Sequence, residues 1–503
     1  MLKFLSQQQI LNKGVYLWKQ HPSFFPKDFF LNEEERLNHT YILWKKDSWK
    51  EGTALNLMIQ DIRKWEWICV IDQNWEYTEL LLSFIPKERV QDVIYFDASE
   101  EERIMWINLY DIDNVDQASD VTELATEMLL QMYWPEIFWP RLQEYFKYWS
   151  LALLEDLEDK PTLLDVVRIF WDDAYRIIKL KKIKNPIVRR WWEYIYNSMP
   201  ENAKREIFPY LSSKFIYLMS NKRLRNIIGQ RKSAFDFKDV IDNKKILLIN
   251  LAKNHLGEVG EELLWLILAY KLKIALIKGA YEPRERHSPS YFYINNFQNQ
   301  LWIPYEDRFN RASYNKVALT LIQDFTEQNT EKNFKKNLLD IINNTWNICI
   351  FNAFPHDAEF FEKEVSKWFE KKTIENLKKN QFLFKSRSLK KPVKLMGYKW
   401  PLAQYNEKIA PILQEYSKKR YGRLNTYIEA ELWVKYWMDI EVKTVENEKW
   451  EKVEVIIFKD KPKTKKQVKK EKKTDKKEVK AKITTAKGIK KTTTKNTKKN
   501  TTK

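Results

Sequence analysis

The stretch from residue 39 to residue 82 constrains the fold of this chain more than any other part of the sequence. Residues 41–43 form a short apolar run typical of a buried strand, and residues 68–71 form a second one. Between them, apolar residues recur at helical spacing over residues 53–62. The order strand, lysine-rich turn, helix, strand is the layout of a nucleotide-binding unit in an α/β fold.

The turn before the helix has the spacing of a phosphate-binding loop (P-loop) but lacks its glycines. In the pattern GxxxxGK[ST], the fixed positions are occupied here by Trp44, Trp49, Lys50 and Glu51. Glycine is needed there because the backbone adopts positive φ and brings its N–H groups against phosphate. Read literally, two indoles block that cradle, and Glu51 replaces the hydroxyl that binds Mg²⁺. The candidate nucleotide-binding residues are Trp44, Lys45, Lys46, Asp47, Ser48, Trp49, Lys50, Glu51 and Gly52.

Tryptophan is unusually frequent in this chain, and glycine is unusually rare. There are 21 Trp and 9 Gly among 503 residues, whereas glycine averages about 7% of protein residues. We hypothesise that many of these codons are UGA, which some bacterial lineages read as glycine. The alternative is a tryptophan-rich protein with ordinary cores, and Trp192, which has aromatic neighbours, is expected to be genuine. The tryptophans that stand where a turn favours glycine are Trp44, Trp49, Trp65, Trp67, Trp75, Trp106 and Trp346.

Length and composition favour a globular protein of two or three domains. No run of about 18 apolar residues predicts a transmembrane segment, and the first residues lack the features of a secretory signal. We therefore expect a cytoplasmic location, with at most peripheral contact to an inner membrane. Cys69 and Cys349 each lie in an apolar run, which favours buried thiols over a disulfide or metal site. The five histidines show no metal-ligand spacing, so no protein metal site is expected.

The formal net charge is +19, and much of the basic sequence lies at the C-terminal end. From about residue 459 the chain is rich in lysine and threonine and nearly free of apolar residues. Such a segment cannot bury enough surface to offset its ordering entropy, so we expect it to be disordered. Two interpretations stay open: the tail holds DNA phosphates or an acidic membrane surface, or it is only a solvating extension.

A resemblance to a known family is carried by residues 70–109, which read VIDQNWEYTELLLSFIPKERVQDVIYFDASEEERIMWINL. This segment resembles the type IV secretion-system DNA-binding domain, the coupling-protein ATPases of TraG/TraD type in the HerA/FtsK superfamily. With the suspect tryptophans read as glycine, the match needs no gap over residues 39–82, and it continues in order over roughly residues 14–435. Gln73 and Asn74 depart from it, because the family usually has Pro and then His or Lys there.

The resemblance implies an α/β fold with a RecA-like P-loop NTPase core, an inserted all-α domain and, here, a disordered basic C-terminal tail. It implies ATP hydrolysis coupled to DNA translocation, with ATP and Mg²⁺ as cofactors. DNA, the type IV secretion or conjugation machinery, and further copies of the chain in a ring, the hexamer of this superfamily, are the implied partners. The expected divisions are a β-rich cap (1–38), the first part of the core (39–115), the all-α domain (116–225), the second part of the core (226–400), a helical extension (401–440) and a Lys/Thr-rich tail (441–503).

The catalytic candidates come from the same resemblance. The run PSYFYINNFQNQL has the layout of a Walker B strand, in which apolar residues end in two polar ones. The family has Asp and Glu there, to hold hydrated Mg²⁺ and to polarise the attacking water, whereas this chain has Asn295 and Asn296. An amide can form hydrogen bonds, but it accepts no proton and brings no negative charge. Gln323 matches the family's sensor glutamine on the next strand.

Three functional interpretations follow. In the first, the chain is an ATPase that forms a ring and moves DNA, with Lys50 binding phosphate, Gln323 sensing the γ-phosphate, and hydrolysis impaired at Glu51, Asn295 and Asn296. In the second, it is a catalytically inactive subunit with the ATPase fold that binds DNA or supports assembly. In the third, it is a basic helical scaffold whose tail binds polyanions.

Overall fold

The computed structural model describes two compact units within Met1–Ala430 and Glu431–Lys503. The described residues are 15–19, 28–44, 50–133, 136–280, 288–296, 313–314, 316–324, 339, 341–365, 370–378, 380–397, 405–446 and 452–460.

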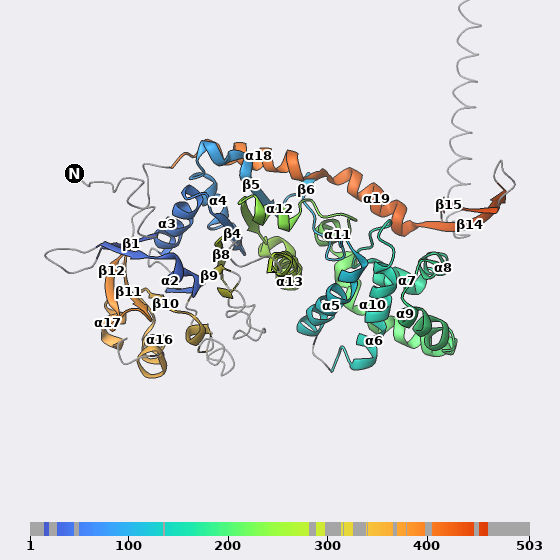
Figure 1. Cartoon of the computed structure of the whole chain (residues 1–503), viewed down its shortest axis with the longest axis horizontal. Coiled ribbons are helices and arrows are strands. Elements are labelled where there is room, and N and C mark those ends of the chain that lie inside the picture. Colours follow the sequence, from blue (N-terminus) through green and yellow to red (C-terminus); the bar gives the residue numbers. More distant parts are fainter. Residues whose placement is uncertain are drawn as a thin grey trace, which may run out of the picture. The chain divides into compact units, whose positions relative to one another are not determined.

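The first unit contains a nine-stranded sheet (Figure 1). Its strands lie in the order β12-β11-β10-β3-β9-β8-β4-β7-β5. Pairing is parallel from β10 through to β5, and only β11 and β12 join antiparallel at one edge. The strands are β3 (Thr40–Trp44), β4 (Trp67–Asp72), β5 (Val93–Asp97), β7 (Ile246–Asn250), β8 (Ser290–Asn295), β9 (Val317–Asp324), β10 (Asn347–Ile350), β11 (Gln381–Ser386) and β12 (Val393–Met396).

The strands predicted at 41–43 and 68–71 and the helix predicted at 53–62 are confirmed. These strands could be predicted because a parallel strand covered on both faces is a continuous apolar run. The helices associated with the core are α2 (Glu33–Leu37), α3 (Lys50–Arg63), α4 (Thr78–Leu82), α12 (Phe237–Asp242), α13 (Lys253–Ala280), α16 (Pro355–Phe360), α17 (Lys371–Glu375) and α18 (Ile409–Tyr421). Two antiparallel pairs of short strands complete this unit: β1 (Val15–Lys19) with β2 (Asp28–Leu31), and β6 (Arg103–Ile104) with β13 (Arg423–Leu424).

All regular elements described between residues 116 and 228 are helical, as expected for an all-α segment (Figure 1). They are α5 (Ala118–Met132), α6 (Pro140–Leu154), α7 (Asp165–Trp171), α8 (Asp173–Lys181), α9 (Pro186–Arg190), the π-helix η3 (Trp191–Tyr196), α10 (Glu201–Ser220) and α11 (Lys222–Ile228). The parallel sheet elsewhere in the unit rules out a purely helical scaffold. The predicted domain boundaries themselves stay a prediction.

The second unit contains a hairpin that the sequence analysis missed. Strands β14 (Met438–Glu446) and β15 (Lys452–Asp460) pair antiparallel, in residues assigned to the helical extension and the tail. The alternation in KVEVIIFKD was the available signal, and its lysines and glutamates were interpreted as tail. The helix that precedes β14 is α19 (Asn425–Trp437). The disorder expected from about residue 459 concerns residues that lie almost entirely outside those described.

Two further expectations concern membrane spans and thiols. None of the helices that the structure describes is long and apolar enough to span a bilayer. Cys69 and Cys349 are buried free cysteines, and burial raises the pKa of both thiols. The prediction of buried thiols is therefore confirmed.

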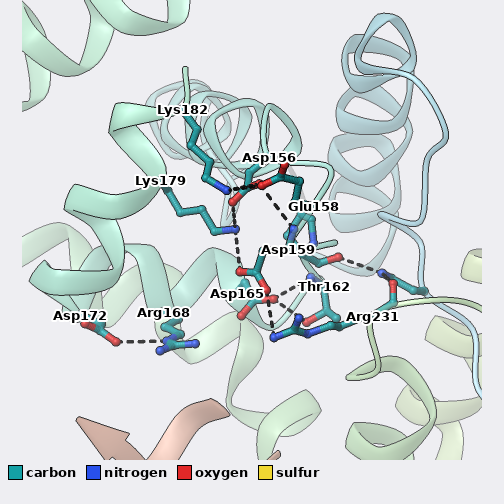
Figure 2. Close-up of polar contacts among 12 residues, drawn as sticks. Asp156, Glu158, Asp159, Thr162, Asp165, Arg168, Asp172, Lys179, Lys182 and Arg231 are labelled. Atoms are coloured by element: carbon teal, nitrogen blue, oxygen red, sulfur yellow. Dashed lines mark hydrogen bonds and ion pairs between the residues drawn. The ribbon is translucent and has the colours of Figure 1, made fainter. Parts of the chain in front are cut away.

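A buried ion-pair cluster holds the helical segment together (Figure 2). Lys179 on α8 is fully buried, and its Nζ lies 2.8 Å from Asp156 Oδ2 and 2.7 Å from Asp159 Oδ2. Lys182 lies 2.9 Å from the other oxygen of Asp156, but its side chain is 39% exposed. Arg231 contacts Asp159 at 3.0 Å, which ties the loop after α6 to the chain segment that follows α11. The charges in this cluster compensate one another, as buried charges must.

Two tryptophans occupy backbone conformations that normally belong to glycine. Trp65 has a φ of 57° and Trp75 has a φ of 43°. Trp65 ends α3 in a Schellman motif, in which its N–H donates to Ile62 O at 3.2 Å and the N–H of Glu66 donates to Asp61 O at 3.1 Å. Glycine is the usual residue at this position, because the left-handed conformation costs other residues about 1 kcal/mol or more.

Trp67 has a different environment. It is 1% exposed on β4 and packs edge-on against Phe292, with ring centroids 4.6 Å apart. Neither Trp67 nor Trp106 nor Trp346 has a positive φ. Trp192, expected to be genuine, is buried among aromatic rings. The recoding hypothesis is therefore supported at the two positive-φ positions and does not fit Trp67.

The helical cluster predicts a contrast between two lysines of one segment. Lys179→Ala is expected to lower the free energy of unfolding by about 3 kcal/mol, because it leaves buried carboxylates without their main partner. Lys182→Ala, the matched control, is expected to change it by less than about 1 kcal/mol, because exposed ion pairs contribute little. Urea unfolding followed by circular dichroism measures both. Equal losses from the two variants would show that burial does not set the contribution.

The same cluster predicts a pH dependence. Burial raises the pKa of Asp156, but hydrogen bonds from Lys179 and Lys182 outweigh this and hold it below its ordinary value. Its stabilising contribution is therefore present at neutral pH and is lost as pH falls below the ordinary pKa of an Asp, about 3.9. The difference in unfolding free energy between the wild type and Asp156→Asn should shrink below that pH. A difference that stays constant down to acid pH would contradict this.

The backbone conformations of Trp65 and Trp67 predict that replacing each with glycine changes the free energy of unfolding by different amounts. Trp65→Gly should change the free energy of unfolding by no more than about 1 kcal/mol. Relief of the left-handed conformation offsets the loss of the contact between Arg89 and the Trp65 ring. Trp67→Gly should lower it by at least about 3 kcal/mol, because it empties a core site. Urea unfolding compares the two variants. A loss from Trp65→Gly as large as that from Trp67→Gly would count against glycine at position 65.

Candidate functional site

Polar side chains lie at the last position of four neighbouring strands and at the last-but-one position of a fifth, β9. We call them the strand-end row: Asp97, Asn250, Asp72, Asn295 and Gln323. They lie on β5, β7, β4, β8 and β9, which are adjacent in that order. All except Asp97 are buried. Ligands of open α/β sheets bind outside the carboxyl ends of the parallel strands. The strand-end row therefore marks the candidate site.

Asn295 is held by two carboxylates that the sequence analysis did not assign to the site. Its Nδ2 donates to Asp72 Oδ1 at 3.0 Å and to Glu76 Oε2 at 3.2 Å. Its Oδ1 is buried and has no hydrogen-bond partner among the described residues. The other oxygen of Asp72 accepts from the backbone N–H groups of Tyr77, at 2.6 Å, and Thr78, at 3.4 Å. The carboxylates missing from β8 are thus present on and just after β4.

Asp72 is fully buried, and burial raises the pKa of its carboxyl group. The hydrogen bonds from Asn295 and Tyr77 favour the charged form and oppose this shift. The available signal for Asp72 was its place at the end of an apolar strand, which it shares with the rest of the strand-end row.

The other two catalytic candidates lie at the same edge. Gln323 is buried on β9, and the Tyr41 hydroxyl on β3 donates to its Oε1. Asn296 follows β8 directly, with a φ of 55°, and its N–H donates to Ile322 O at 3.0 Å. Asn295 pairs with Ile322 in the β8–β9 register. The structure therefore brings Asn295, Asn296 and Gln323 together; whether they act in catalysis stays a prediction.

The predicted P-loop connects β3 to α3, next to the strand-end row. β3 ends at Trp44 and α3 begins at Lys50, so the loop leaves the carboxyl end of one strand and enters a helix N-terminus. Residues 45–49 lie outside the described residues, as do the side chains of Trp44, Lys50 and Glu51. Gly52 is buried in the first turn of α3. Nucleotide binding by this segment stays a prediction.

A buried ion pair fixes α3 against the sheet. Arg36 on α2 forms a two-pronged contact with Asp61 on α3, at 2.5 and 2.7 Å. The Tyr293 hydroxyl on β8 donates to Asp61 at 2.6 Å and accepts from Arg36 at 3.0 Å. Burial lowers the pKa of Arg36, but the carboxylate of Asp61 raises it by more. The net pKa lies above the ordinary value of an arginine, so the guanidinium stays charged. The helix after the loop and the strand that carries Asn295 are thereby tied together.

Comparison with known proteins comes from solved structures, since no protein-family model and no curated protein matches. The chain is similar to the unbound monoclinic form of the bacterial conjugative coupling protein TrwBdeltaN70, with a TM-score of 0.53 and 11% identity over 76% of this chain and 88% of that one. It is also similar to plasmid coupling protein TrwB in complex with ADP and Mg²⁺, with a TM-score of 0.51 and 11% identity over 75% and 90% of the chains. A complex of TrwB with a non-hydrolysable ATP analogue gives a TM-score of 0.52 at 11% identity, over 75% and 88%.

At this identity the likeness establishes the fold. It confirms the α/β P-loop NTPase fold class predicted from the sequence. The chain therefore has the fold of the conjugative coupling protein TrwB, in agreement with the family resemblance of its sequence.

Proposed function

We propose that this chain is a P-loop ATPase of a type IV secretion or conjugation-like machinery, which acts on DNA as a translocase or coupling protein. The observation that carries the proposal is the strand-end row beside the loop that enters α3, on the TrwB fold. Structures of TrwB with ADP and Mg²⁺ and with an ATP analogue support ATP and Mg²⁺ as the cofactors.

The geometry is compatible with nucleotide at this edge. Phosphate groups bind at helix N-termini, where backbone N–H groups and the helix dipole favour anions. The first residue of α3 is Lys50, the residue that the P-loop pattern assigns to the phosphates. Gln323 lies on β9, the strand between β3 and β8, where it can sense the γ-phosphate. Magnesium would be held mainly by phosphates and waters, because no group of three or more His, Cys, Asp or Glu suited to a metal occurs in the described residues.

The proposed partners are DNA, further copies of the chain and the secretion machinery. The net charge of +19 favours sequence-independent binding to DNA phosphates. A place in a conjugation machinery is supported by the likeness to a conjugative coupling protein. A homo-oligomeric ring and a cytoplasmic location peripheral to the inner membrane are expectations from the sequence.

A second candidate function is an inactive subunit that binds nucleotide or DNA without hydrolysis. The observation that favours it is Asn295, whose amide occupies the Walker B position and is already bonded to Asp72. An amide cannot act as a general base, and Asn296 cannot polarise water as glutamate does. The two candidates agree on nucleotide binding and differ in turnover.

The test uses the full chain with Trp44→Gly and Trp49→Gly, the form that the recoding hypothesis predicts. We expect it to bind a fluorescent ADP analogue and to hydrolyse ATP faster when DNA is added. Lys50→Ala should weaken nucleotide binding at least tenfold, or about 1.4 kcal/mol, because it removes the phosphate contact. The matched control, Lys64→Ala at the other end of the same helical segment, should leave nucleotide affinity unchanged.

The outcomes separate the candidates. Binding with turnover that Lys50→Ala abolishes supports the ATPase. Binding without turnover supports the inactive subunit. Absence of nucleotide binding in the glycine-bearing chain, or equal effects of the two lysine variants, would overturn the proposal.

A further inference from the structure

The orientation of the Asn295 amide is fixed by its neighbours. Carboxylates only accept hydrogen bonds, so the NH₂ group of Asn295 must face Asp72 and Glu76. The amide oxygen diverges from the nitrogen and therefore lies on the side of the amide away from Asp72. That oxygen is buried and has no partner among the described residues. Because a buried acceptor without a partner is unfavourable, a ligand that supplies a donor or a cation is expected there.

The chemistry of this atom fits hydrated magnesium. Mg²⁺ takes oxygen ligands, keeps several of its waters, and uses few protein groups when substrate phosphates bind it. An amide oxygen can accept a hydrogen bond from such a hydration shell. It lacks only the negative charge that a Walker B carboxylate provides, and Asp72 places that charge 3.0 Å from the other atom of the same amide.

We propose that Asp72 and Asn295 act as a pair that replaces the missing Walker B acid, with Asn295 Oδ1 facing the hydrated Mg²⁺ of a bound nucleotide. Asp72 is a positioning residue: it fixes the amide orientation, polarises it and supplies the negative charge from the neighbouring strand. Glu76, whose side chain is exposed, also accepts a hydrogen bond from the amide and also supplies negative charge. The inference rests on the proposed nucleotide-binding function.

The pair also accounts for asparagine at position 295. An Asp there would bring a third carboxylate within hydrogen-bond distance of Asp72 and Glu76, and like charges so close cannot all stay ionised. One carboxylate and one amide can lie side by side at positions 72 and 295 without this repulsion. The arrangement therefore predicts that the two residue types can be exchanged between β4 and β8 with the total charge preserved.

The experiment separates nucleotide binding from cation binding. Affinity for a fluorescent ADP analogue is measured first in EDTA, and Mn²⁺ affinity of the ADP complex is then measured by electron paramagnetic resonance. The protein is the full chain with Trp44→Gly and Trp49→Gly. Circular dichroism melts check that each variant is folded.

Asp72→Asn should weaken Mn²⁺ binding at least tenfold and leave ADP affinity in EDTA unchanged. The new NH₂ group at position 72 would turn the Asn295 amide around and direct its NH₂ at the cation. The exchange Asp72→Asn with Asn295→Asp should restore Mn²⁺ affinity to within about threefold of the parent. Glu79→Gln, which removes one exposed carboxylate from α4 nearby, should leave it unchanged.

Unchanged Mn²⁺ affinity in Asp72→Asn, or no recovery in the exchanged pair, would overturn the inference. If Asp72→Asn fails to fold, Glu76→Gln carries the test, because its side chain is exposed; a loss of two- to fivefold is then expected, and no loss contradicts the inference. If the parent chain binds no ADP in EDTA, the proposed function itself is overturned. A variant that loses only Mn²⁺ affinity leaves the proposed function standing.

Discussion

The ion pair between Arg36 and Asp61 is the interaction on which the candidate site depends. It joins α2, the helix after the P-loop and, through Tyr293, the strand that carries Asn295. Both charges are buried, so removing either partner would leave the other uncompensated, at a cost of about 3–5 kcal/mol. The pair bonds to Tyr293, which lies two residues before Asn295 on β8. Its role is to keep α2, α3 and the sheet in one arrangement.

The order of the strands explains how one chain assembles a site from distant segments. Residues 72 and 295 are neighbours because β4 and β8 are adjacent, although 223 residues separate them. Parallel pairing brings the carboxyl ends of these strands to one edge. A changed residue at one strand end can therefore be compensated from the next strand, and Asp72 beside Asn295 is such a compensation.

The sequence predicted much of the fold and only part of the site. Buried parallel strands such as residues 68–71 were recognisable because their apolar runs are continuous. The hairpin at residues 438–460 was missed because alternating charged residues resemble a solvated tail. Asp72 was missed because motif comparison treats position 295 alone, whereas the Asp72 contact follows from sheet order. Trp67 lacks the glycine-like backbone of Trp65, and its side chain fills a core site between β4 and β8.

In this site the negative charge lies on and just after β4, while the acceptor oxygen lies on β8. The most direct measurement is a crystal structure of the full chain with ADP and Mg²⁺. We expect the hydrated cation to lie within hydrogen-bond reach of Asn295 Oδ1, and Asn295 Nδ2 still to donate to Asp72. A cation placed elsewhere, or an Asn295 amide turned with its NH₂ toward the nucleotide, would contradict the account.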